Sequence, residues 1–175
     1  TRRRTRRPDD RLVEGAGGEG DEGCTGIKIE VGSTVERDLR RLAAVREAIG
    51  PEVTLAVDGN GKWDLASCLR FCRGAEPCDV FWFEEPLWHD DVKGHAQLAR
   101  TTHIPVALGE QRYTADAFSE YLEQQDINWV QHDCKRTGGT SEVLKGCEDG
   151  HARRPYDARP GGATSTAHEC HTQAQ

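Results

Sequence analysis

The sequence predicts an α/β fold whose strands form a parallel sheet. Five runs of β-branched or aromatic residues alternate with segments in which apolar residues recur at helical spacing. Each run is four or five residues long and apolar enough for a strand that is buried on both faces. Strands that alternate with helices pair in parallel, because each helix returns the chain to the same end of the sheet.

The predicted elements follow one another from residue 25 to about residue 148. The strands are expected at residues 27–31, 53–57, 80–83, 104–108 and 127–130. Three helical stripes are formed by Leu39, Leu42, Val45 and Ile49, by Leu65, Cys68, Leu69 and Cys72, and by Phe118, Tyr121 and Leu122. N-cap positions are occupied by Asp64, Asp90 and Thr114. Gly50, followed by Pro51, is expected to end the first helix.

Acidic residues follow three successive strands at a constant interval. Asp58, Glu84 and Glu110 are each 26 residues apart. A fourth acid, Asp133, comes 23 residues after Glu110, just beyond the last predicted strand. Any one of these acids is equally well explained as a cap of the next helix or turn. Matched positions in successive units place them on one rim of the sheet, and in a closing barrel such side chains converge where barrel enzymes keep their chemistry.

The three evenly spaced carboxylates predict a bound cation. Without one they would repel each other, and each would raise the pKa of its neighbours. No histidine or cysteine accompanies them, and an all-oxygen set favours a hard cation, Mg²⁺ ahead of Mn²⁺ or Ca²⁺. The seven cysteines include no Cys-x-x-Cys pair and are expected to be reduced, buried thiols.

The charge distribution argues against nucleic acid as a partner, and the lack of a long apolar run argues against a membrane. Residues 1–11 carry a net charge of +4 and residues 151–175 carry +1, which leaves −12 for residues 12–150 within the total of −7. An acidic domain lacks the concentrated basic face that phosphate binding needs. No apolar run approaches the roughly 18 residues that span a bilayer, and no signal-peptide segment follows residues 1–7. A cytoplasmic protein is therefore expected.

The chain contains no methionine, and its two ends lack the periodicity of the middle. We expect an irregular basic segment at residues 1–22, a domain at 23–150 and an irregular tail at 151–175, the whole being a piece of a longer protein. The ends are rich in Arg, Gly, Pro, Thr and Ala, as a GC-rich gene read in a shifted frame would be. This composition leads to the hypothesis that the chain is the product of a damaged or mis-called gene whose middle is authentic. The hypothesis would be contradicted if the DNA around the two junctions encoded no related sequence in another reading frame.

Five segments together resemble the enolase superfamily, in particular the mandelate racemase/muconate lactonizing enzyme group. They are GIKIEVG at 26–32, DLRRLAAVREAIGPEVTLAVDGNGKW at 38–63, FWFEEPLWHDD at 81–91, IPVALGEQ at 104–111 and QHDCKRTGG at 131–139. The resemblance implies a partial TIM (β/α)₈ barrel that holds strands two to six with their helices. It also implies that Asp58, Glu84 and Glu110 bind Mg²⁺, while the adjacent Glu85 supports the site by pairing or hydrogen bonding.

The reaction of this group begins with removal of the proton α to a carboxylate. The resemblance places Lys28 beside the developing enediolate, and it places Glu30 where the base is usually a second lysine. Asp133 matches an acid that normally orients a catalytic histidine, and Arg136 matches a basic residue before paired glycines. Asn60 matches a position that reaches the substrate. The histidine partner has no counterpart in the sequence that lies on a predicted strand.

The resemblance favours an acid-sugar dehydratase, which removes an α-proton and then a β-hydroxyl group. A racemase or epimerase that uses the same intermediate is the closest alternative. A catalytically inactive remnant and a metal-binding interaction module are the others. The expected partner is a small carboxylate substrate, with neither nucleic acid nor membrane, and the full-length protein is expected to be a homo-oligomer.

Overall fold

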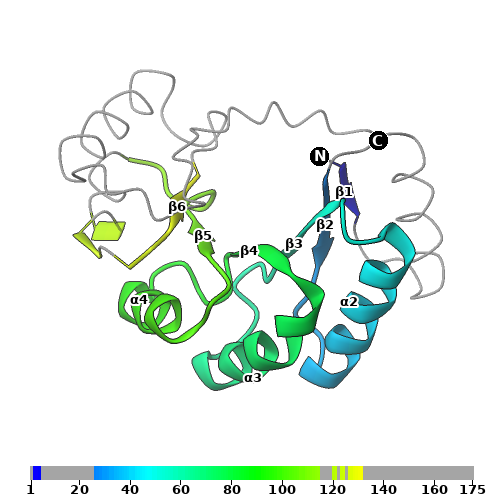
Figure 1. Cartoon of the computed structure of the whole chain (residues 1–175). Coiled ribbons are helices and arrows are strands. Elements are labelled where there is room, and N and C mark those ends of the chain that lie inside the picture. Colours follow the sequence, from blue (N-terminus) through cyan, green and yellow to red (C-terminus); the bar gives the residue numbers. More distant parts are fainter. Residues whose placement is uncertain (1, 5–25, 115–119, 122, 125, 132–175) are drawn as a thin grey trace.

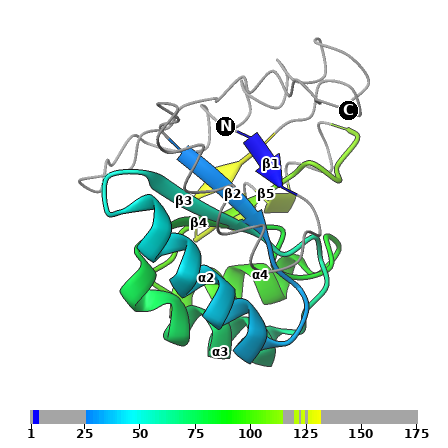
Figure 2. The ribbon, with the colours of Figure 1, turned by 90° about the vertical axis from the view of Figure 1, so that its right-hand side faces the viewer.

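The computed structural model describes residues 2–4, 26–114, 120–121, 123–124 and 126–131. Six strands form one parallel sheet in the order β1-β2-β3-β4-β5-β6. The strands are β1 (Arg2–Arg4), β2 (Gly26–Glu30), β3 (Thr54–Asp58), β4 (Val80–Glu84), β5 (Val106–Leu108) and β6 (Trp129–Val130). The helices are α2 (Val35–Ile49), α3 (Leu65–Ala75), the short 3₁₀ helix η1 (Glu76–Cys78) and α4 (Val92–Thr101). Helices α2, α3 and α4 follow one another along the outer face of the curved sheet (Figures 1 and 2).

The predicted strands and the first two helices are confirmed, with shifts at their ends. Strand β5 begins at Val106 rather than at residue 104, because Pro105 has no N–H to donate to the sheet. Strand β6 begins at Trp129, since the Asn128 side chain accepts the hydrogen bond from Val106 N at 2.9 Å. Asp64 caps α3 and Gly50 ends α2, both as predicted.

Two expectations need correction. The side chain of Asp91, not that of Asp90, caps α4 by accepting from Gly94 N at 2.9 Å. The N-terminal segment is not irregular throughout, because Arg2–Arg4 pairs in parallel with β2. A ladder uses backbone groups alone, so the free edge of β2 accepts a strand that has no apolar pattern. The third predicted helix falls mostly on residues outside the described part of the chain.

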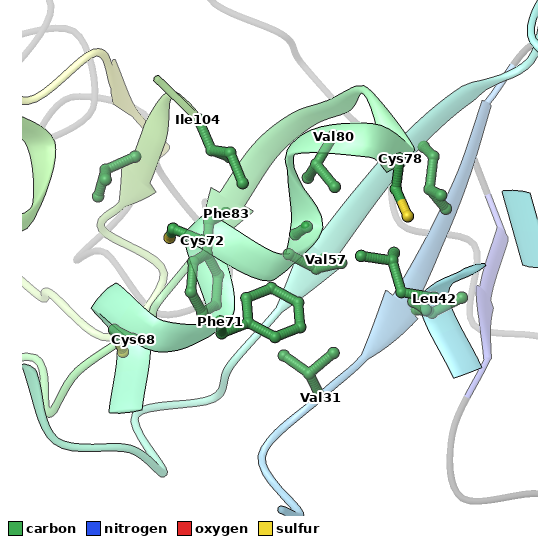
Figure 3. Close-up of a cluster of buried hydrophobic side chains, with 14 of the residues drawn as sticks. Val31, Leu42, Val57, Cys68, Phe71, Cys72, Cys78, Val80, Phe83 and Ile104 are labelled. Carbon is green, nitrogen blue, oxygen red and sulfur yellow. The ribbon is translucent and has the colours of Figure 1, made fainter. Parts of the chain in front are cut away.

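The hydrophobic core lies between the sheet and the helices that cover it (Figure 3). Phe71 of α3 packs on Phe83 of β4 with ring centroids 5.4 Å apart, and Trp63 lies 5.0 Å from Phe71. Cys68 and Cys72 are buried free thiols in this core, as predicted, and burial raises the pKa of Cys72 to about 11. Every helix that the structure describes is too short or too polar to cross a membrane.

Candidate metal centre

The three evenly spaced acids meet at the carboxyl ends of their strands. Asp58 is the last residue of β3, Glu84 is the last residue of β4, and Glu110 lies two residues beyond β5. One oxygen of each carboxylate lies within 4.8 Å of the others. Asp58 and Glu84 are opposite each other in the ladder and are buried, whereas Glu110 is half-buried. The 26-residue interval therefore corresponds to one cluster of side chains in space.

The turn after β3 fixes Asp58 against the end of β4. Its Oδ1 accepts from Asn60 N at 3.0 Å, and Gly59 N donates to Glu84 O at 2.8 Å. Asn60 has a φ of 50°, a left-handed conformation that asparagine adopts more readily than most residues. Gly61 N then donates to Glu85 O at 2.7 Å. The turn after β3 is therefore bonded to two successive residues at the end of β4, Glu84 and Glu85.

Replacing Gly59 with alanine is expected to disturb this fastening. A Cβ at residue 59 would lie 2.8 Å from Glu85 O and 3.0 Å from Pro86 Cα, so backbone atoms would have to move. We expect a loss of about 1–3 kcal/mol in the free energy of unfolding, measured by chemical denaturation. Gly26→Ala is the matched control, because its Cβ would meet its nearest neighbour, Thr54 Cβ, at an ordinary 3.4 Å. Equal stability of the two variants would contradict the prediction.

Lys28 brings a positive charge to two of the three acids. Its side chain is only 4% exposed, its ammonium group contacts the Glu84 carboxylate, and it lies 3.9 Å from Asp58 Oδ2. Lys28 therefore points inward, on the face of β2 opposite to that of Ile27 and Ile29. The cluster places three carboxylates, those of Asp58, Glu84 and Glu110, near this one ammonium group, which leaves a local excess of negative charge.

Burial raises the pKa of Glu84 to about 7, and the charges of Asp58 and Glu110 push it in the same direction. Lys28 opposes this shift through its charge and its hydrogen bond. The buried carboxylate is therefore held with too little positive charge around it, the electrostatic setting in which a cation binds.

Glu85 supports the three acids through a hydrogen bond made beside Glu110. Its φ of 41° lies in the left-handed region, which few residues other than glycine adopt. The side chain is buried, and its Oε1 accepts from Gly109 N at 2.8 Å. Glu85 thereby fixes the residue next to Glu110, in line with the predicted supporting hydrogen bond. Burial raises the pKa of Glu85 to about 7 as well.

Of the other candidate residues, two lie in the described part of the chain and two do not. Glu30 ends β2 opposite Asp58 in the ladder, so it lies on the same rim of the sheet as the three acids. Asn60 is half-buried beside Asp58. Asp133 and Arg136 lie outside the described residues.

Sequence reasoning missed one buried polar side chain, that of His95. His95 of α4 is fully buried, with Nδ1 bonded to Asp91 O at 2.8 Å, and its Nε2 accepts from Leu87 N at 3.3 Å. It thus fastens helix α4 to the loop that follows Glu85. A histidine on the apolar face of a helix was the available signal, but the partners are backbone atoms that the sequence does not reveal.

The stability of the fold should depend on the neutral form of His95. Burial lowers its pKa from 6.5 to about 4, so the unfolded chain binds a proton that the folded chain excludes between these values. The contribution of neutral His95 to the free energy of unfolding is fully present above pH 6.5 and is lost as the pH falls towards 4. The total change is on the order of 3 kcal/mol. The raised pKa values of Glu84 and Glu85 make the free energy of unfolding fall as the pH rises, which is the opposite of the effect of His95. The effect of His95 must therefore be obtained by comparing the unmodified chain with a variant that lacks this histidine.

The measurement is the free energy of unfolding against pH for the unmodified chain and for His95→Gln. The difference in the free energy of unfolding between the unmodified chain and His95→Gln should shrink as the pH falls below 6.5. His103→Gln, at an exposed position, should keep a constant difference. A constant difference for His95→Gln as well would show the prediction to be wrong.

Comparison with known proteins identifies the family. The family model described as enolase C-terminal domain-like matches residues 12–154. The chain belongs to this family. It is 40% identical over 126 residues to the L-talarate/galactarate dehydratase of Salmonella typhimurium, covering 71% of this chain and 32% of that protein. It is 36% identical over 124 residues to the arabinonate dehydratase of Saccharolobus solfataricus, covering 70% of this chain and 33% of that one.

Solved structures of the enolase family share the fold. An L-talarate dehydratase from Polaromonas sp. JS666, in complex with Mg and L-glucarate, superposes with a TM-score of 0.80 at 33% identity. A mandelate racemase/muconate lactonizing enzyme from the same organism gives the same TM-score and identity. In both cases the match covers 86% of this chain and 42% of the other. The partial barrel and the resemblance to this group are thus confirmed, and the chain spans about a third of the length of the curated relatives that it matches.

Proposed function

We propose that this chain carries the metal centre of a Mg²⁺-dependent enzyme that dehydrates acid sugars. The observation that carries the proposal is the convergence of Asp58, Glu84 and Glu110, with the ammonium group of Lys28 against Glu84 and 3.9 Å from Asp58 Oδ2. The proposed reaction removes the proton α to a carboxylate and then eliminates the hydroxyl group on the β-carbon.

The three acids fit Mg²⁺ in chemistry and in spacing. Mg²⁺ prefers oxygen ligands at about 2.0–2.1 Å, so two of its ligands lie at most about 4.2 Å apart. The candidate oxygens lie within 4.8 Å of one another, so small side-chain rotations bring them to one ion. Asp58, Glu84 and Glu110 are therefore the proposed ligands.

Bound Mg²⁺ would supply positive charge where the substrate carboxylate becomes an enediolate. Lys28, held by Glu84 at the same rim, adds a fixed positive charge in a buried setting, where such charges act most strongly. Glu30, at the end of the neighbouring strand, is the residue proposed to face the α-proton. Asn60 is proposed to contact the substrate. Asp133 and Arg136 complete the proposed catalytic set.

The proposed steps balance without a further reactant. The base takes the α-proton, and the electrons of the C–H bond form the enediolate. The C–O bond to the β-hydroxyl group then breaks, and that group leaves as water after it takes a proton from a general acid. The resulting enol rearranges to a 2-oxo acid.

The names of the relatives support the substrate class. Two of them are dehydratases of talarate or galactarate and of arabinonate, and a solved neighbour contains L-glucarate. All four molecules are acid sugars with a hydroxyl group next to the carbon that loses its proton. This shared feature is what the proposed elimination requires.

The test is turnover of these four acid sugars by the 175-residue chain with Mg²⁺, followed by formation of the 2-oxo product. Loss of product on removal of Mg²⁺ with a chelator would support the proposal. Exchange of the α-hydrogen with deuterated water in the absence of 2-oxo product would favour a racemase instead. Neither product nor exchange, with Mg²⁺ still raising the melting temperature, would favour a metal-binding module.

A further inference from the structure

The side chain of Arg112 connects two loops of the barrel rim. Its Nη2 donates to His89 O at 3.0 Å, and its Nη1 donates to Asp90 Oδ1 at 3.3 Å. The guanidinium carbon lies 4.7 Å from the centroid of the Tyr121 ring, a cation–π distance. Glu120 Oε2 lies 3.6 Å from Nη2. The arginine side chain is only 12% exposed, whereas Asp90 and Glu120 are more than half exposed. The contacts of Arg112 with His89 O and with the buried Tyr121 ring are therefore better shielded from solvent than its two ion pairs.

Tyr121 reinforces the same contact. It is fully buried, and its hydroxyl group also donates to His89 O. The carbonyl oxygen of His89 therefore accepts from both Arg112 and Tyr121, which uses both of its lone pairs. Two side chains that follow β5 thus converge on one carbonyl oxygen of the loop after β4.

This junction bears on the third acid of the cluster. Asp58 and Glu84 end strands and are fixed by the ladder, whereas Glu110 lies beyond β5 in a turn. That turn is closed by Arg112 N, which donates to Gly109 O at 3.0 Å. Its first residue is held by Glu85, and its last residue is Arg112, whose side chain reaches back to the neighbouring loop.

The geometry points to Arg112 as a positioning residue that holds Glu110 within reach of Asp58 and Glu84. This inference rests on the proposed metal site and adds a determinant of its affinity. Glu85 anchors one end of the turn and Arg112 anchors the other, so Glu110 approaches the other two acids without a strand of its own. Lysine cannot replace this arrangement in full, because its single ammonium group does not donate at two fixed angles while it lies flat on a ring.

The experiment measures Mg²⁺ affinity of the full chain by isothermal titration calorimetry. We expect Arg112→Met to raise the dissociation constant at least tenfold and Arg112→Lys to raise it less. Arg100→Met is the matched control, because Arg100 forms an exposed ion pair with Asp126 at 2.8 Å. Its dissociation constant should stay within twofold of that of the unmodified chain. A value within twofold for folded Arg112→Met would overturn the inference.

Two further measurements keep the test decisive. If Arg112→Met does not fold, Tyr121→Phe removes one of the two donors to His89 O and keeps the ring. Unchanged affinity in both Tyr121→Phe and Arg112→Lys would then overturn the inference. If the unmodified chain binds no Mg²⁺, the proposed metal site is wrong. Hydrogen exchange at Arg112 N then tests the junction itself: faster exchange in Arg112→Lys supports it, and unchanged exchange overturns it.

Discussion

Glu84→Gln is expected to weaken Mg²⁺ binding by this chain severely. The substitution keeps the size of the side chain but removes the central carboxylate, which lies beside Asp58 in the ladder and within 4.8 Å of the other candidate ligand atoms. We expect the dissociation constant to rise at least about 100-fold, which corresponds to about 2.7 kcal/mol. An ion that binds only the folded state raises its stability by a similar amount at about 100 times its dissociation constant. The melting temperature of Glu84→Gln should therefore stop responding to Mg²⁺.

The measurements are calorimetric titration and thermal melting with and without Mg²⁺. Glu52→Gln is the control, since Glu52 is an exposed glutamate in the turn before β3, at the opposite end of the strand from Asp58. It should bind Mg²⁺ as the unmodified chain does. Should Glu84→Gln retain the affinity of Glu52→Gln, the ion would have to bind elsewhere, and the proposed centre would be wrong.

The part of the site that lies on regular strands was predictable from the sequence. Asp58 and Glu84 end buried strands, and parallel pairing brings such ends to one rim whatever the details of the helices between them. The inward direction of Lys28 follows from the alternation of side chains along β2. These predictions depend only on period and spacing, which are local properties of the chain.

The parts that depend on irregular contacts were not predictable. Helix α4 has too few apolar residues for a clear stripe, because Gly94 and the polar His95 occupy its buried face. Asp90 was predicted as the cap of α4, and only the geometry of the loop shows that the adjacent Asp91 takes this position. The contact between Arg112 and His89 O joins residues 23 apart in two loops, where no periodicity records the approach.

Lys28→Met is expected to make the fold dependent on Mg²⁺. Lys28 is buried against Glu84 and lies 3.9 Å from Asp58 Oδ2, so its loss leaves buried carboxylates without their ammonium partner. Removing one member of a buried ion pair costs about 3–5 kcal/mol, and we expect this loss in the metal-free chain. A cation bound by the same carboxylates would restore much of it. The increase in melting temperature caused by Mg²⁺ should therefore be larger in Lys28→Met than in the unmodified chain.

Turnover of Lys28→Met should stay low even where Mg²⁺ restores its fold. If Lys28 stabilises the charge that develops on the substrate, saturating Mg²⁺ should restore the fold of Lys28→Met and leave turnover about 100- to 1,000-fold lower. Lys93→Met, at an exposed position on α4, should change neither property. Because folding and chemistry are measured on the same variant, the outcome separates two roles of Lys28. Full recovery of turnover with Mg²⁺ would limit Lys28 to balancing the buried charge, whereas a lasting loss assigns it to the reaction.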